Sequence, residues 1–216
     1  VKNLATVVAT ENPADVDALK ACTYPGSSLT VTEIMQEKVM SIGENMQIRR
    51  FARFADNTSV AYVHAGGTHG VLVNLAVEGD ADVTEIGKNV AMQIAAMNPK
   101  YWDKANVPQA DVDHEMSVQL ALMENDPKMA SKPEQVREKI VMGKLNKFYS
   151  ENCLLQQEFV RGDIFQGSVE SYIADAAKKL GGKVTFKTAV RFEKGEGIEK
   201  KQENFAAEIA SMVKKA

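Results

Sequence analysis

The stretch Gly43–Phe54, with the sequence GENMQIRRFARF, is the starting point for interpreting the chain. Its side chains alternate between apolar and polar types, which is typical of a half-buried β-strand. One face would carry Met46, Ile48, Ala52 and Phe54, with Arg50 as a polar exception, and the other Gln47, Arg49 and Arg53. We therefore predict a strand here, with a basic outer face exposed to solvent.

Three more alternating runs accompany this stretch, at Ser59–His64, Val71–Val77 and Lys183–Phe192. The turn at Asp56-Asn57 and the wider glycine-rich turn Ala65–Gly70 would join the first three strands. In the last run we expect Val184, Phe186, Thr188, Val190 and Phe192 to face inward, and Thr185, Lys187 and Arg191 to face outward. Strands and helices in this order predict an α+β fold, an antiparallel sheet layered with helices.

Apolar residues at helical spacing predict the remaining elements of the body. A capping threonine (Thr30 or Thr32) and Gly43 would bound one helix, and Asn98-Pro99 would end another. The expected helices are Val1–Ala9, Ala14–Ala21, Thr30–Ile42, a helix from about Gly79 to Met97, Ser168–Leu180, and a carboxyl-terminal helix within Gly195–Lys215 that carries Phe205, Ile209 and Met212 on one face.

The region 101–159 differs from the rest because its apolar stripes are narrow. We predict helices at Asp111–Met123 and Pro133–Phe148 that form an inserted antiparallel helical hairpin, packed as a short coiled coil. The stripes would be Val112, Met116, Leu120 and Met123 on the first helix, and Val136, Ile140, Lys144 (by its stem), Leu145 and Phe148 on the second. The alternative, two helices lying flat on the sheet, would need broader apolar faces.

The composition excludes several classes of protein. The 216 residues are 44% hydrophobic and 25% charged, as in ordinary globular proteins, and the net charge of −3 argues against a general nucleic-acid binder. No apolar run approaches the roughly 20 residues that span a bilayer, and the amino end lacks a signal-peptide pattern. Two cysteines far apart, Cys22 and Cys153, indicate reduced thiols in a cytoplasmic protein rather than a disulfide framework.

No group of residues has the spacing of a catalytic or metal site. His64 and His69 flank Gly66-Gly67, but no acidic or thiol side chain nearby in sequence completes a metal site. The glycine-rich turn lacks the phosphate-loop pattern, and a strand follows it rather than a helix. We therefore expect no cofactor, no metal and no enzymatic activity, and interpret the turn as a contact surface displayed by a rigid sheet.

Four stretches of the chain resemble the elongation factor Ts family, in the family's order and over nearly the whole length. They are Ile42–Arg50 (IGENMQIRR); His69–Val73 (HGVLV) with the helix end Ile94–Pro99 (IAAMNP); Gly143–Phe148 (GKLNKF); and Val190–Lys201 (VRFEKGEGIEKK) with Asn204–Glu208 (NFAAE). Each motif alone is modest, and together they are specific.

The resemblance implies a guanine-nucleotide exchange factor whose partner is elongation factor Tu. It divides the chain into a helical remainder of a first core subdomain (1–42), a second core subdomain (43–100 and 160–194), the inserted hairpin (101–159) and a carboxyl-terminal module (195–216). The partner-binding residues it suggests are His64, Gly66, Gly67, His69 and Gly70 on the turn, and Ile198, Phe205 and Ile209 at the carboxyl end.

One departure from the family pattern concerns activity. The family's Thr-Asp-Phe-Val segment, which disturbs the magnesium and phosphate end of the partner's nucleotide site, does not occur in these 216 residues. We therefore expect a piece of a longer protein, without the amino-terminal domain and with reduced exchange activity. The alternative is a structural module that forms homodimers through sheet edges or the hairpin. Direct contact with nucleic acid or membrane is not expected.

Overall fold

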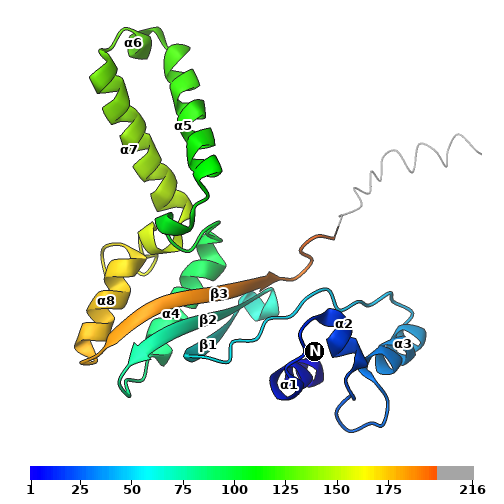
Figure 1. The fold of residues 1–216 in the computed structure, drawn as a ribbon. Helices are drawn as coiled ribbons and strands as arrows, with labels where there is room; N and C mark the ends of the chain where they lie inside the picture. Colours follow the sequence, from blue (N-terminus) through cyan, green and yellow to red (C-terminus); the bar gives the residue numbers. More distant parts are fainter. Residues whose placement is uncertain (199–216) are drawn as a thin grey trace, which may run out of the picture. The chain divides into compact units, whose positions relative to one another are not determined.

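The computed structural model describes residues 1–198, which fall into two compact units, Val1–Ser59 and a second unit that begins at Val60. The described residues form eight α-helices and a three-stranded antiparallel sheet (Figure 1). The predicted α+β class is confirmed. The predicted carboxyl-terminal helix, with Phe205 and Ile209, lies outside the described residues.

The first unit is built from three short helices, α1 (Lys2–Glu11), α2 (Val16–Ala21) and α3 (Val31–Ile42). The start of α3 is a capping box: the Thr30 hydroxyl accepts from the Glu33 amide, and the Glu33 carboxylate accepts from the Thr30 amide at 2.7 Å. Gly43 ends α3 in the left-handed conformation, as expected. The helices enclose a small core of Val7, Val8, Leu19 and Val31.

The predicted strand at Gly43–Phe54 is wrong, because these residues form neither helix nor strand. The alternation itself is present: Met46, Ile48, Ala52 and Phe54 are half-buried, while Gln47, Arg49 and Arg53 are exposed. Phe51 is also half-buried, and together with Ile48 it packs against the helical core of the first unit. An alternation of apolar and polar residues indicates an extended segment with one face buried, but it does not show that the segment pairs with another strand.

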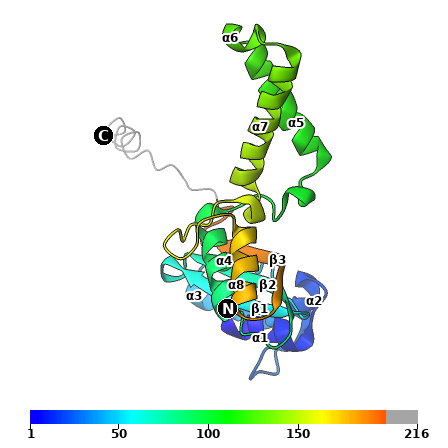
Figure 2. The ribbon, with the colours of Figure 1, turned by 90° about the vertical axis from the view of Figure 1, so that its left-hand side faces the viewer.

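In the second unit, β1 (Thr58–His64), β2 (His69–Glu78) and β3 (Lys183–Glu193) lie in the order β1-β2-β3. Helices α4 (Thr84–Met97) and α8 (Val169–Lys179) cover one face of the sheet (Figures 1 and 2). On α4 the apolar residues Ile86, Val90 and Ile94 are buried, and they meet β2 and β3 in one core. That core includes Val71, Val73, Leu75, Ile86, Val90, Ile94, Leu154, Phe159, Ile173, Val184 and Phe186.

The inward face predicted for β3 is correct only as far as Phe186. Pairing with β2 shifts between Asn74 and Leu75, which oppose Thr188 and Phe186, so Lys187 is an extra residue on β3. Such a β-bulge moves every later side chain to the other face. Ala189 is therefore buried in place of Val190, and Arg191 faces the helix-covered side that it was expected to avoid.

The region 101–159 contains α5 (Gln109–Glu124), the short α6 (Pro127–Ala130) and α7 (Glu134–Asn152). Helices α5 and α7 lie side by side, and both views show them extending from the sheet of their unit (Figures 1 and 2). Val112, Met123, Val141 and Leu145 are buried along them. Two residues of the predicted stripes are instead substantially exposed, Leu120 at 44% and Val136 at 40%. Coiled-coil packing remains a prediction.

Candidate partner-binding site

The connection from β1 to β2, hereafter the His64–Gly70 turn, has an unusual backbone. Three consecutive residues have positive φ: Ala65 (47°), Gly66 (64°) and Gly67 (94°), and they form a short 3₁₀ turn, η1 (Ala65–Gly67). Glycine adopts this conformation readily, whereas an alanine there is strained. The tip from Ala65 to Thr68 is exposed. The sheet therefore displays an exposed main-chain surface with a defined conformation at this turn.

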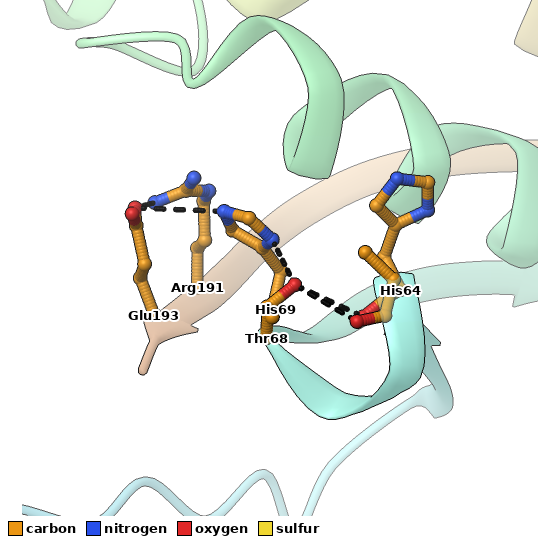
Figure 3. Close-up of polar contacts among 6 residues, drawn as sticks. His64, Thr68, His69, Arg191 and Glu193 are labelled. Atoms are coloured by element: carbon orange, nitrogen blue, oxygen red, sulfur yellow. Dashed lines mark hydrogen bonds and ion pairs between the residues drawn. The ribbon is translucent and has the colours of Figure 1, made fainter. Parts of the chain in front are cut away.

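Two histidines flank this tip, and each ring has a hydrogen-bond partner; Figure 3 shows both rings and the bond between His69 and Thr68. The Tyr62 hydroxyl lies 2.9 Å from Nδ1 of His64, and the Thr68 hydroxyl lies 3.0 Å from Nδ1 of His69. The two imidazole rings are 6.2 Å apart between centroids. Both histidines are half-buried, so each presents only part of its ring at the surface.

The end of β3 completes this cluster. Glu193 is the cross-strand partner of His69, and its Oε2 lies 3.6 Å from His69 Nε2. Arg191 Nη1 donates to the same oxygen at 2.9 Å, and the Arg191 side chain is only 14% exposed (Figure 3). The bulge at Lys187 produces this arrangement, because it turns Arg191 onto the covered face.

The structure thus brings five of the predicted site residues together on the His64–Gly70 turn: His64, Gly66, Gly67, His69 and Gly70. A sixth, Ile198, is 68% exposed at the end of the described residues, while Phe205 and Ile209 lie beyond them. Sequence reasoning missed Tyr62, Thr68, Arg191 and Glu193. Thr68 and Tyr62 are sequence neighbours of the histidines, whereas Arg191 and Glu193 required the β2–β3 register.

The side chains at this turn do not form a metal site in the described part of the chain. Among residues 1–198 there is no group of three or more histidine, cysteine, aspartate or glutamate residues placed to hold a metal ion. Cys153 is buried, and its burial, with Asp103 nearby, raises the pKa of its thiol to about 11. His114, the third histidine, is exposed on α5. In the described part of the chain no helix is both long and apolar enough to cross a membrane.

Fold and turn together describe an α+β protein whose three-stranded sheet displays an exposed turn and whose helices α5 and α7 extend from that sheet. A family model described as Elongation factor TS matches residues 1–196. Over 215 residues the chain is 40% identical to elongation factor Ts of Syntrophotalea carbinolica, covering 98% of this chain and 69% of the relative. It is 42% identical over 219 residues to elongation factor Ts of Clostridioides difficile (99% and 69% covered).

The chain therefore belongs to the elongation factor Ts family, and so to the elongation factors of protein biosynthesis. The resemblance found in the sequence motifs is confirmed.

Proposed function

We propose that this chain binds elongation factor Tu in its GDP-bound form and promotes release of GDP, in the cytoplasm and without covalent chemistry. The observation that carries the proposal is the family match along residues 1–196. The His64–Gly70 turn supports it, because a rigid, exposed tip with two held histidines suits recognition of a protein surface.

An exchange factor can release GDP from its partner by binding alone, because its own binding and the binding of GDP to that partner are thermodynamically linked. If the factor binds the nucleotide-free partner more tightly than the GDP-bound partner, the same free-energy difference weakens the partner's hold on GDP. Such a mechanism needs complementary surfaces and no general acid, general base or metal of its own. The lack of a metal-ligating cluster among the described residues is compatible with this mechanism.

We assign the first contact to the His64–Gly70 turn, with His64 as its principal side chain. The second contact would come from the carboxyl-terminal module, beginning at the exposed Ile198 and continuing through Phe205 and Ile209. We further propose that α5 and α7 pack as a coiled coil, with Val112, Met123, Val141 and Leu145 between them. Two separate contacts on one chain would raise the affinity above that of either contact alone.

For these 216 residues we expect binding with weak exchange, since they contain no Thr-Asp-Phe-Val segment. The test is release of a fluorescent GDP analogue from elongation factor Tu, followed at increasing concentrations of this chain beside a family member that carries the segment. Saturable, slow acceleration supports the proposal. No acceleration together with no binding refutes it, and full-rate exchange refutes the importance assigned to that segment.

Analytical ultracentrifugation separates this proposal from the dimer alternative. We expect the chain to sediment with elongation factor Tu as a complex. A stable homodimer that ignores elongation factor Tu would instead favour a structural module.

A further inference from the structure

We propose that Glu193 is a positioning residue for the His64–Gly70 turn: it fixes the His69 ring, which in turn decides how Thr68 closes the turn. The consequence for partner binding rests on the proposed function above. The positioning role itself concerns the free protein and can be tested without any partner.

Glu193 is itself held firmly at the end of the β2–β3 ladder. Arg191 donates to its Oε2 at 2.9 Å, and this charge-assisted bond joins two side chains on the same face of one strand. Arg191 is 14% exposed and its Nε is buried without a hydrogen-bond partner, so the Glu193 carboxylate is the compensating charge for a largely desolvated cation. The Lys194 amide also donates to the Thr68 carbonyl at 2.8 Å, which ties the strand end to the turn.

The carboxylate restricts the protonation pattern of His69. An ionised carboxylate can only accept hydrogen bonds, so its charge 3.6 Å from Nε2 favours the ring form that carries a proton on Nε2. In a neutral imidazole, Nδ1 is then an acceptor. The Thr68 hydroxyl, 3.0 Å from Nδ1, supplies the proton.

Thr68 has a single hydroxyl proton and three acceptors within reach, of which the carbonyl oxygen of His64 is the farthest at 3.5 Å. Its oxygen lies 3.0 Å from His69 Nδ1 and 3.2 Å from the carbonyl oxygen of Ala65, the residue with strained backbone at the start of the tip. If His69 carried its proton on Nδ1, the ring would donate to Thr68, and Thr68 would donate to Ala65. The state of His69 therefore decides whether the Thr68 hydroxyl donates to the ring or to a carbonyl of the turn, while the Thr68 amide donates to the Ala65 carbonyl at 3.4 Å in either case. Figure 3 draws the contacts of this hydroxyl.

The other groups that face His69 do not replace Glu193. The His64 ring is 6.2 Å away between centroids, and its own Nδ1 is engaged with the Tyr62 hydroxyl at 2.9 Å. Arg191 is a cation and would repel a proton on the ring. Among these neighbours, Glu193 is the anion that can hold the Nε2–H form.

The test compares Glu193→Gln with Glu78→Gln in the full chain. Glu78 is a matched control, because it sits at the opposite end of the same ladder, opposite Lys183, with which it forms an exposed ion pair at 3.3 Å. Both substitutions keep the side-chain shape and remove one negative charge. Circular dichroism and Trp102 fluorescence establish that each variant is folded.

Long-range ¹H–¹⁵N spectra of the free protein report which nitrogen of His69 is protonated. We expect Glu193→Gln to shift His69 away from the Nε2–H form and to move the amide signals of Gly66, Gly67 and Gly70, while Glu78→Gln leaves both unchanged. Identical His69 and glycine signals in wild type and Glu193→Gln would overturn the inference.

Affinity for elongation factor Tu gives the separate partner readout. Loss of a pre-organised turn should weaken binding by about 2- to 10-fold, the effect of having to order one or two side chains on association. If Glu193→Gln changes the His69 and glycine signals but not the affinity, the positioning role is supported and the assignment of this turn to the interface is refuted. If Glu193→Gln leaves the His69 and glycine signals unchanged, the positioning role is refuted, whatever the affinity.

Discussion

Gly87 on α4 gives a quantitative test of how the second unit is assembled. A Cβ atom at this position would meet Val60 Cγ2 at 2.4 Å and Val60 Cβ at 2.5 Å. Val60 is buried on β1, the strand that leads to the His64–Gly70 turn. Because Val60 Cβ is fixed to its backbone, rotating the side chain cannot relieve the contact, and the helix and strand must separate.

Two opposing effects decide the outcome of Gly87→Ala. Overpacking a well-packed core costs typically about 1–3 kcal/mol, and a contact this short belongs at the upper end of that range. Replacing glycine by alanine within a helix returns about 1 kcal/mol. We expect a net loss of about 2 kcal/mol in the free energy of unfolding, because the steric cost exceeds the gain in helix propensity.

Gly143 on α7 provides the matched control. It is exposed within a helix of the same unit, and a Cβ there would meet no heavy atom within 4 Å. Gly143→Ala should therefore stabilise the protein by up to about 1 kcal/mol. The same substitution in two helices of one unit is thus expected to act with opposite signs.

Equilibrium urea unfolding followed by Trp102 fluorescence measures both variants. Trp102 is the only tryptophan and lies 5.7 Å from Phe186 between ring centroids, so its signal reports the core of the second unit. For a slope of about 2 kcal/mol per molar urea, the midpoint should fall by about 1 M for Gly87→Ala. A Gly87→Ala protein as stable as wild type would refute the close packing of α4 on β1.

Two further predictions concern the first unit and the thiols. Thr30→Ala should destabilise α3 by about 1 kcal/mol, measured by thermal unfolding, because it removes the side-chain half of the capping box. The Thr30 hydroxyl also donates to the Glu33 carboxylate at 2.8 Å, and hydrogen bonds from the Thr30 amide and hydroxyl lower the pKa of Glu33. The part of the deficit that comes from this hydroxyl–carboxylate bond is present at neutral pH and is lost as the pH falls through that lowered pKa, so a deficit of Thr30→Ala that does not shrink as the pH is lowered would contradict it. At pH 8 a thiol reagent should modify the half-buried Cys22 quickly and Cys153 only on unfolding. The Cys153 thiol is buried, and its burial both excludes the reagent and raises its pKa to about 11. Equal modification rates for the two cysteines in the folded protein would contradict this prediction.

The features predicted correctly from the sequence are those that depend on residues close together along the chain. Thr30 (with Thr32 as the alternative), Gly43 and Asn98 marked helix ends because capping depends on residues only a few positions apart, whereas the partner of Thr30 in the capping box, Glu33, came from the structure. Alternation likewise located β1, β2 and β3 within a few residues. The two histidines and three glycines came together because they are neighbours along the chain.

The remaining features depend on contacts between distant residues. The bulge at Lys187 is set by pairing with Asn74 and Leu75, more than a hundred positions earlier, so the period of two continued through it in the sequence. Arg191 was consequently assigned to the wrong face, and its bond to Glu193 was missed. Gly43–Phe54 shows the same limit, because alternation fits both a strand and an extended segment that covers helices.

The central claim is that the His64–Gly70 turn is where this member of the elongation factor Ts family meets its partner. Calorimetric titration of elongation factor Tu·GDP with wild type, His64→Ala and His114→Ala tests it most directly; His114 is an exposed histidine on α5, away from the turn. We expect His64→Ala to weaken binding at least about 10-fold, as for a side chain central to an interface, and His114→Ala to bind like wild type. Equal affinities for wild type and His64→Ala would contradict the claim.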